Sequence, residues 1–139
     1  SVFVVAYAKT SRGILYLLLK RKLHWYGWEF PKGGIRLFEW GKRAVKREIR
    51  EETGLKILSI KHFHFSGKYN YDKEFPDRPG VIGQKFSLYS AEVEKNKIIL
   101  GNEHSGYAWV PYSKAIKKLT WQNQKESLKI VNSWLKGKT

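Results

Sequence analysis

Two uninterrupted apolar runs open the chain and predict its first strands. Residues 2–8 (VFVVAYA) are all apolar, and a second run, ILYLLLK, follows Gly13. Apolar runs of this length, bounded by turn residues, are typical of buried strands, and a glycine between two of them favours a hairpin. We therefore expect the chain to begin with a buried strand and a hairpin or near-hairpin.

Residues 42–53 carry the spacing of an amphipathic helix, after a polar and aromatic loop at 21–34. Val45 and Ile49 lie four residues apart, so both would face the core. Gly54 stands where a residue in the left-handed conformation ends many helices. The expected N-cap is not Ser, Thr, Asp or Asn, so the helix lacks the usual side-chain cap.

The remaining pattern predicts more strands and a covering helix. Alternating positions favour a strand at 56–65, and apolar runs favour strands at 84–93 and 107–111. Residues 66–83 are so rich in Gly, Pro and Asp that we expect a long loop there. A helix is predicted over 121–135, because its apolar residues recur at helical spacing. Its inward side would carry Trp121, Leu128, Val131, Trp134 and Leu135. The whole arrangement predicts an α/β (α+β) fold.

The composition favours one globular domain over residues 1–139. Hydrophobic residues make up 42% of the 139 positions and aromatic residues 15%, which suits a substantial core and excludes a disordered chain. There is no cysteine, which excludes disulfides and thiolate metal sites and fits a reducing compartment. The apolar runs are too short to span a bilayer, and the N-terminus lacks the pattern of a signal peptide. We therefore expect a cytoplasmic protein with no membrane segment.

The chain is strongly basic. It has 27 Lys and Arg residues against 12 Asp and Glu residues, which gives a formal net charge of +15. This balance suits polyanionic partners such as nucleotides, RNA or DNA. A lysine-rich surface that serves no special partner is equally compatible with it. The basic residues are spread along the chain and form no tail, which weakens the case for a dedicated nucleic-acid arm.

Three glutamates nevertheless gather in one short segment of this basic chain. Glu48, Glu51 and Glu52 would share one face of a helix, because they are three and four residues apart. Two carboxylates roughly 6 Å apart repel by about 3 kcal/mol at an effective dielectric constant of about 20. Hard divalent cations such as Mg²⁺ bind carboxylate oxygens and would turn this repulsion into binding. The alternative is a solvated acidic face paired with nearby cations, namely Arg43, Lys46, Arg47 and Arg50.

A wider pattern surrounds these glutamates. Residues 33–55 (GGIRLFEWGKRAVKREIREETGL) carry a set of fixed positions, namely Gly33, Glu39, Arg47, Glu48, Ile49, Glu51, Glu52, Gly54 and Leu55. This pattern resembles the complete signature of the Nudix hydrolase family. The resemblance implies a mixed β-sheet sandwiched between α-helices, with a loop–helix–loop catalytic motif. It also implies hydrolysis of a nucleoside diphosphate linked to another group, with Mg²⁺ as the cofactor and Mn²⁺ as its substitute.

The resemblance implies roles for individual residues. The metal ligands would be the Gly33 carbonyl and the carboxylates of Glu48, Glu51 and Glu52. Arg47 would hold the glutamates in place through ion pairs, and Glu39 would brace the preceding loop. Related enzymes place another glutamate in a later loop, where Glu103 stands here. Either Glu52 or Glu103 would then remove the proton from the attacking water.

Two further stretches indicate a subclass. WEFPKGG, at 28–34, resembles dinucleoside tetraphosphate hydrolases and also RNA 5′-pyrophosphohydrolases. The stretch from Glu103 to Leu135 resembles the former, and GQKF at 83–86 resembles the latter. We expect Mg²⁺-dependent hydrolysis of diadenosine tetraphosphate to ATP and AMP. The alternatives are an RNA 5′-pyrophosphohydrolase or decapping enzyme, and a non-catalytic nucleotide-binding module, against which the intact glutamate set argues.

Several residues outside the signature are candidates for substrate binding. Lys32 and Lys85 would clamp phosphates, with His24 as a weaker candidate, although most lysines are simply solvated. Four aromatic residues would stack on adenine or, alternatively, pin the long loop to the sheet; they are Tyr69, Tyr71, Phe75 and Tyr107. The pattern leaves open whether the protein is a monomer or a homodimer.

Two other groups of side chains have competing interpretations. His62 and His64 alternate along a predicted strand, which favours sheet packing over a metal pair. Leu37, Phe38 and Trp40 stand where the family commonly has a tight turn. They would bury against the core, contact a partner or line the substrate entrance.

Overall fold

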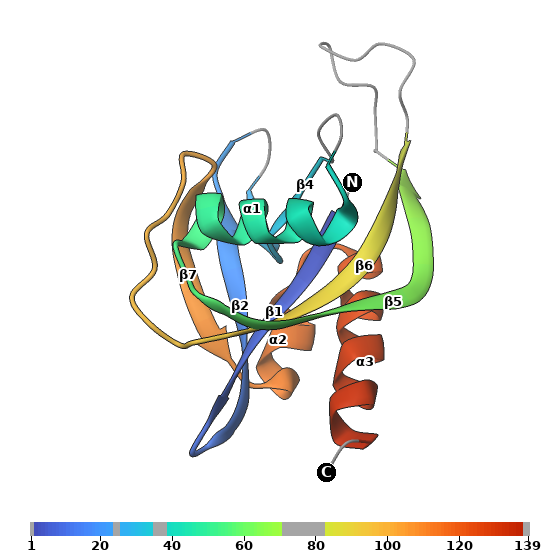
Figure 1. The fold of residues 1–139 in the computed structure, drawn as a ribbon. Coiled ribbons are helices and arrows are strands. Elements are labelled where there is room, and N and C mark those ends of the chain that lie inside the picture. The colour runs from blue at the N-terminus through green and yellow to red at the C-terminus, as the bar shows by residue number, and fades with distance from the viewer. Residues whose placement is uncertain (1, 24–25, 35–38, 71–82, 138–139) are drawn as a thin grey trace.

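The computed structural model describes residues 2–23, 26–34, 39–70 and 83–137, with the backbone alone at 64–70 and 83–86. Its centre is a mixed seven-stranded sheet with the order β3-β2-β1-β6-β5, to which β4 and β7 add by pairing with β1 and β2 (Figure 1). The strands are β1 (Val2–Thr10), β2 (Gly13–Arg21), β3 (Gly27–Glu29), β4 (Lys32–Gly33), β5 (Ile57–Asn70), β6 (Gly83–Val93) and β7 (His104–Val110).

The predicted hairpin is present at the N-terminus. β1 and β2 are antiparallel, with Thr10 opposite Gly13 at the turn. On its other edge β1 pairs in parallel with β6, which is itself antiparallel to β5. β1 therefore lies inside the sheet, which explains why its sequence is apolar on both faces.

Three helices cover the two faces of the sheet. α1 (Gly41–Thr53) lies on one face, and α2 (Tyr112–Lys118) and α3 (Gln122–Gly137) lie on the other (Figure 1). The expected sandwich of a mixed sheet between helices is confirmed. Among the described residues, no helix combines the length and apolar character that crossing a membrane requires.

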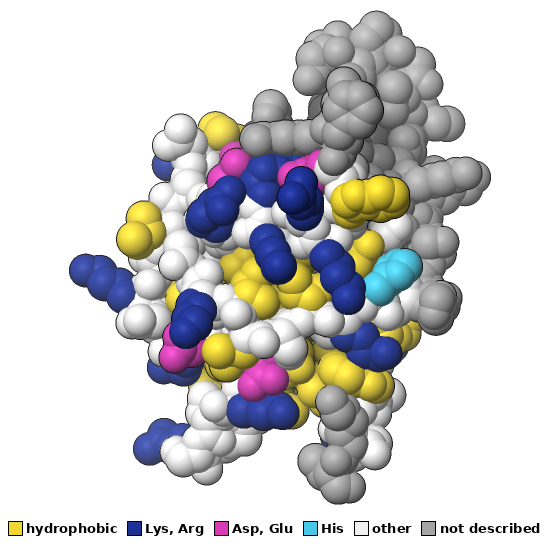
Figure 2. All heavy atoms as spheres, viewed as in Figure 1, with side chains coloured by type: hydrophobic (Ala, Val, Ile, Leu, Met, Phe, Trp, Pro, Cys, Tyr) yellow, Lys and Arg dark blue, Asp and Glu magenta, His cyan; other side chains and the backbone are white. Residues whose placement is uncertain are grey.

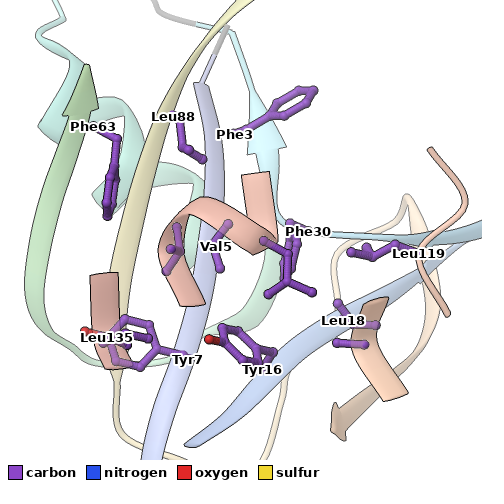
Figure 3. Packing of buried hydrophobic residues seen from close by; sticks show 13 residues of the cluster. Phe3, Val5, Tyr7, Tyr16, Leu18, Phe30, Phe63, Leu88, Leu119 and Leu135 are labelled. Carbon is purple, nitrogen blue, oxygen red and sulfur yellow. The ribbon is translucent and has the colours of Figure 1, made fainter. Parts of the chain in front are cut away.

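Alternate residues of β1 supply two separate cores. Phe3, Val5 and Tyr7 point into the core beneath α2 and α3, which Figure 3 shows from close by. Val2, Val4 and Ala6 point into the core beneath α1, where they meet Val45 and Ile49. The core beneath α2 and α3 also takes the inward side of α3, through Leu128, Val131 and Leu135. This period of two follows from the strand pleat.

The two ends of α1 are built as the sequence predicts. Trp40 occupies the N-cap and makes no side-chain capping bond. Gly54 ends the helix with φ of 72°, and its amide donates to the carbonyls of Ile49 and Arg50 at 3.2 and 3.0 Å. A side chain at Gly54 would be strained by this left-handed conformation. The helix therefore stops sharply after its last carboxylates.

Three details of the predicted layout are wrong. The expected loop at 21–34 contains two short strands, β3 and β4, which pair with longer neighbours. The expected loop at 66–83 starts too early, because β5 continues to Asn70 against β6. Cross-strand pairing outweighs the turn-forming composition there. α2 was not predicted, since its seven residues are too few to show a clear period.

Candidate active site

One end of β2 brings distant segments of the chain together. β2 lies between β3, which ends at Glu29, and β7, which begins at His104. Arg21, the last residue of β2, is the register partner of His104. The carbonyl of Glu103 accepts a 2.9 Å hydrogen bond from the Lys22 amide. Sheet pairing thus places a buried carboxylate, a histidine and a loop glutamate around one arginine.

Two glycines let α1 approach this end of the sheet. A Cβ added to Gly33 on β4 would collide with the carboxylate of Glu48. A Cβ added to Gly101, in the loop before β7, would lie 3.2 Å from the carbonyl oxygen of Glu51. A side chain at Gly33 would displace the Glu48 carboxylate, and one at Gly101 would press on the backbone of the helix. Through them, the glutamate-bearing side of α1 lies against β4 and the loop that carries Glu103.

Arg47 forms a cluster with the acidic residues nearest to it. It uses both Nε and Nη2 on Glu39, at 2.8 and 2.9 Å, and it donates to the Gly34 carbonyl at 2.6 Å. Its Nη1 reaches Glu48 at 2.6 Å and Glu51 at 3.5 Å. The expected ion pairs of Arg47 are therefore present. Glu39 pairs with the same arginine, and its role as a brace of the preceding loop stays a prediction. We call these residues the Arg47 cluster.

Ionisation in the Arg47 cluster reflects this pairing. The hydrogen bonds from Arg47 to Glu39 and then to Glu48 raise the pKa of the guanidinium, although burial opposes them. Burial raises the pKa of Glu48, an effect that its bond to Arg47 reduces and that Glu51 and Glu103 reinforce. Arg47 thus offsets part of the repulsion among neighbouring carboxylates.

A second cluster surrounds Glu29, which is fully buried. Its Oε2 lies 2.8 Å from His104 Nε2 and 3.0 Å from Arg21 Nη1, and its Oε1 lies 3.6 Å from Lys32 Nζ. Arg21 Nη1 also reaches Glu103 at 3.4 Å. Burial raises the pKa of Glu29, but the bond from His104 and the charges of Lys32 and Arg21 outweigh it, so the net shift is downward. We call these residues the Arg21 cluster.

Glu52 interacts with glutamates of both clusters, and no described residue forms an ion pair with its carboxylate. Its side chain is buried, and its Oε2 has no hydrogen-bond partner in the described part of the chain. Burial raises the pKa of Glu52 well above its usual value, and Glu48, Glu29 and Glu103 add to the shift. The Lys32 amide opposes it by donating a hydrogen bond. A proton or a cation is therefore favoured at this carboxylate.

The residues around Glu52 fit a divalent cation. One ligand atom each from Glu52, Glu103 and His104 lie within 4.8 Å of one another. A buried carboxylate oxygen without a partner is unfavourable unless something binds it. Carboxylate oxygens are the donors that Mg²⁺ and Mn²⁺ take, and imidazole nitrogen suits several transition metals. Glu48 and Glu51, also expected as ligands, are held by Arg47, and their metal role stays a prediction.

The described candidates for substrate binding differ in their environments. Lys32 is partly buried beside Glu29, and burial lowers the pKa of its amino group. Tyr107 is 42% exposed on β7, so its ring is available for stacking. Lys85 lies on β6, where the structure describes the backbone alone, as it does for Tyr69 on β5. The roles of these residues remain predictions.

Other predicted residues lie outside the described part of the chain, namely His24, Tyr71 and Phe75, together with Leu37 and Phe38. Trp40 is described and is 79% exposed, so it does not bury against the core. His62 stacks on Tyr89 with ring centroids 4.6 Å apart, as the packing interpretation expects.

Three members of the Arg21 cluster were missed as site residues in the sequence, namely Arg21, Glu29 and His104. A signal existed for Glu29, because an acidic residue stands inside the aromatic and apolar stretch WEF. His104 follows a predicted site residue directly. Arg21 carries no such signal, because its role depends on the pairing of β2 with β3 and β7.

A shallow groove lies on another side of α1, between the helix and the start of β5. Its wall carries Lys42, Lys46 and Arg50, and its floor is largely aliphatic, from Leu55 to Ile60. Figure 2 shows this face, where Lys and Arg side chains surround an apolar patch. None of the residues that line the groove is acidic. The groove therefore offers a cation no carboxylate, unlike the glutamate-bearing side of the helix.

Comparison with known proteins places the chain in a family. The model of the NUDIX domain matches residues 1–130. Dihydroneopterin triphosphate diphosphatase from Haemophilus influenzae is 30% identical over 135 residues, which cover 93% of this chain and 84% of that protein. An RNA pyrophosphohydrolase from H. influenzae is 33% identical over 97 residues, which cover 61% of this chain. The match spans about half of that enzyme's own length, 50%.

A solved structure agrees with the family match. The Ap4A hydrolase from C. elegans superposes with a TM-score of 0.73 and 22% identity, over 98% of both chains. At this identity the likeness supports the fold alone. The family model, the H. influenzae diphosphatase and the geometry around Glu52 all agree with the motif at residues 33–55. The chain belongs to the Nudix family of hydrolases, which act on acid anhydrides.

Proposed function

We propose that the protein hydrolyses a phosphoanhydride bond of a nucleoside polyphosphate, with Mg²⁺ or Mn²⁺ as cofactor. We further propose diadenosine tetraphosphate as its substrate and ATP and AMP as its products. The observation that carries the chemistry is the buried carboxylate of Glu52, whose Oε2 has no partner among the described residues and which lies close to Glu103. A purely structural acidic face would be solvated or paired with cations.

The metal would be held by carboxylates on α1 and the loop beside it. Glu52 and Glu103 are its nearest convergent donors, and Glu48, Glu51 and the Gly33 carbonyl are the further candidates from the motif. When bound, a divalent cation would neutralise phosphate oxygens and make a water molecule more acidic. Arg47 would keep Glu48 and Glu51 oriented towards this region through its ion pairs.

The chain's own residues would then carry the proton transfer. Glu52 or Glu103 accepts a proton from the attacking water, whose oxygen bonds to phosphorus as the bond to the leaving phosphate breaks. Burial raises the pKa of the Glu52 carboxyl, which makes its ionised form a stronger proton acceptor than an ordinary glutamate. Glu103 is the more accessible of the two, since half of its side chain is exposed. A carboxylate has two oxygens, so one can bind a cation while the other takes the proton.

Two features of the protein favour a dinucleoside polyphosphate, namely an exposed aromatic ring for a base and a positive charge for the phosphates. Tyr107 offers an exposed ring for a base, and stacking of this kind contributes about 1–3 kcal/mol. A net charge of +15 favours a highly charged substrate. Dihydroneopterin triphosphate is the second candidate, because the relative that acts on it matches nearly the whole chain.

A substrate panel tests this proposal. Hydrolysis with Mg²⁺ is measured for diadenosine tetraphosphate, dihydroneopterin triphosphate and 5′-triphosphate RNA at matched concentrations. We expect the highest kcat/KM for the dinucleotide. The ranking is overturned if the pterin or the RNA is cleaved faster, and the anhydride chemistry itself is overturned if no polyphosphate is cleaved with either metal.

Salt dependence separates the dinucleotide from RNA independently of the panel. Phosphate contacts release counterions, so affinity falls more steeply with salt as more phosphates are contacted. We expect a shallow dependence for the KM of the dinucleotide and a steep one for the dissociation constant of RNA. RNA that stays tightly bound near physiological salt, and is cleaved faster than the dinucleotide there, would make RNA the substrate.

Glu103→Gln tests which residue takes the proton. If Glu103 is only the base, turnover should fall while the Mg²⁺ concentration for half-maximal activity stays constant. If it binds the metal, that concentration should rise. Glu126→Gln, which replaces an exposed carboxylate on α3 with an amide, is the control for the loss of one negative charge. Wild-type values for both quantities would remove Glu103 from the mechanism.

A further inference from the structure

The imidazole of His104 is one of the least accessible polar groups in the protein. It is 2% exposed at the start of β7. Its Nε2 lies 2.8 Å from Glu29 Oε2, whereas its Nδ1 has no partner among the residues that the structure describes. A buried ring nitrogen in this state needs an explanation, because buried polar atoms are nearly always bonded.

The contact with Glu29 determines how the ring can act. A carboxylate only accepts hydrogen bonds, so Nε2 carries the proton and donates it to Glu29. In a neutral ring, Nδ1 then keeps a free lone pair. Pairing of one ring nitrogen with a carboxylate is the arrangement that orients histidine ligands of metals and makes them more basic. Arg21 and Lys32 keep Glu29 in place from its other sides, at 3.0 and 3.6 Å.

The neighbours of His104 complete a set of donors. One ring nitrogen of His104 lies within 4.8 Å of a carboxylate oxygen of both Glu52 and Glu103. Ligands on opposite sides of a small cation, at about 2.1 Å each, are about 4.2 Å apart. Only one pair of three ligands can be opposite, and adjacent ligands are about 3.0 Å apart. A movement of up to about 1.8 Å would therefore bring all three donors onto one ion. Glu103 is free to make it, because half of its side chain is exposed.

We propose that His104 is a nitrogen ligand of a divalent cation that it binds together with Glu52 and Glu103, with Glu29 as the residue that orients the ring. The site then has a mixed nitrogen and oxygen donor set, which selects Mn²⁺, Co²⁺ or Zn²⁺ over Mg²⁺. The inference rests on the proposed metal-dependent function and deepens it, since the signature motif supplies oxygen donors alone.

The nearby cations, Arg21 and Lys32, position the glutamates of this site and do not take the place of the metal ion. Glu29 takes the shorter contact of Arg21 Nη1, at 3.0 Å, and Glu103 takes the longer one, at 3.4 Å. Lys32 Nζ is directed to Glu29. When Glu52 is ionised, as it is when it binds a cation, the three glutamates carry one more charge than Arg21 and Lys32 can offset. The competing arrangement is a doubly protonated His104 that donates to the carboxylates, and the experiment distinguishes the two.

Pulsed electron paramagnetic resonance of the Mn²⁺-loaded full chain tests the ligand directly. Coordinated imidazole gives a nitrogen coupling to the Mn²⁺ electron spin, whereas carboxylates and water do not. We expect this coupling in the wild type, its loss in His104→Gln, and its retention in His62→Gln, whose exposed ring lies on β5. Absence of the coupling in the wild type, or its persistence in His104→Gln, overturns the proposal.

A measurement on the wild type alone covers the case in which His104→Gln does not fold. With nitrogen-15 histidine, Zn²⁺ should shift the Nδ1 resonance of a ring whose Nε2 keeps its proton. A ring with both nitrogens protonated and unchanged by Zn²⁺ would support the competing arrangement and reject ours.

Affinity measurements by titration calorimetry add a second readout. His104→Gln should weaken Mn²⁺ binding at least about tenfold and Mg²⁺ binding much less, and Glu29→Gln should weaken Mn²⁺ binding by about tenfold through the ring it orients. Equal losses for both metals in His104→Gln would reject the nitrogen ligand. If Mn²⁺ binds without nitrogen coupling and supports hydrolysis, this inference fails and the proposed function survives. If no polyphosphate is cleaved while the coupling is present, the proposed function fails and the inference about His104 survives.

Discussion

The Arg47 and Arg21 clusters both lie near Glu52, but they differ in how completely their polar atoms are hydrogen-bonded. Arg47 makes five hydrogen bonds, one for each of its N–H groups. In the Arg21 cluster and at Glu52, by contrast, three buried atoms have no hydrogen-bond partner among the described residues. They are Glu29 Oε1, Glu52 Oε2 and His104 Nδ1.

This difference distinguishes residues that stabilise the site from residues that can bind a ligand or transfer a proton. Arg47 uses all its N–H groups on Glu39, the Gly34 carbonyl and two carboxylates of α1, so it has no donors left for a substrate. Glu29 Oε1 still has the Lys32 ammonium at 3.6 Å. Glu52 Oε2 and His104 Nδ1 are unfavourable in a folded protein unless a ligand binds them. We therefore expect substitutions of Arg47 and Glu39 to act strongly on stability, and those around Glu52 mainly on binding and turnover.

The largest effect is expected for Arg47→Ala. It leaves Glu39 and Glu48 partly buried without their cation, which typically costs about 3 kcal/mol or more. We expect a loss of this size in the free energy of unfolding, measured by urea denaturation, together with a loss of activity. Arg43→Ala, at an exposed position of the same helix, should change stability by less than about 0.5 kcal/mol. Equal effects of the two variants would contradict the special status of Arg47.

Glu52→Gln tests the other side of the comparison. The variant keeps the size of the side chain and removes its charge, and with it a cation ligand or a proton acceptor. We expect turnover with Mg²⁺ to fall at least about a hundredfold, which is typical for loss of such a group. Glu126→Gln should retain wild-type turnover. Near-normal activity of Glu52→Gln would remove this face of α1 from the mechanism.

The two clusters also differ in how far the sequence could predict them. Arg47, Glu48 and Glu51 lie within five residues on one helix, so their spacing alone places them together. The end of that helix could also be predicted from nearby residues, since Gly54 determines the last turn by its own conformation. The expected ion pairs were consequently correct.

Arg21, Glu29 and His104 could not be predicted in this way. They meet only because β2 pairs with β3 on one side and with β7 on the other, and strand pairing depends on the whole sheet. The same reason explains the error at 66–70, where pairing with β6 overrides a turn-like composition. The apolar run at residues 2–8 predicted a buried strand, but it could not show which helices cover the two faces of β1.

The smallest effect concerns the pH dependence of stability without metal, measured in the presence of a chelator. The pKa of Glu52 is raised in the folded protein by burial and by its neighbouring carboxylates. Below the usual carboxyl pKa of about 4.5, Glu52 is protonated in both the folded and the unfolded chain, so its charge has no influence. As pH rises through this value, the unfolded chain releases the proton while the folded chain retains it. The wild type should therefore lose stability relative to Glu52→Gln until pH passes the folded pKa.

Glu29 should show the opposite sign, because its pKa is lowered in the folded protein. Its contribution is complete above the usual carboxyl pKa and is lost as pH falls through the lower folded value. Adding Mn²⁺ at neutral pH sharpens the contrast. A cation at one hundred times its dissociation constant stabilises the folded state by about 2.7 kcal/mol, and this gain should be smaller in Glu52→Gln than in the wild type. The contrary result is a free energy of unfolding that changes equally with pH in Glu52→Gln and the wild type from pH 4 to neutrality, with equal gains from Mn²⁺. It would show that Glu52 is as fully hydrogen-bonded or paired as the carboxylates around Arg47.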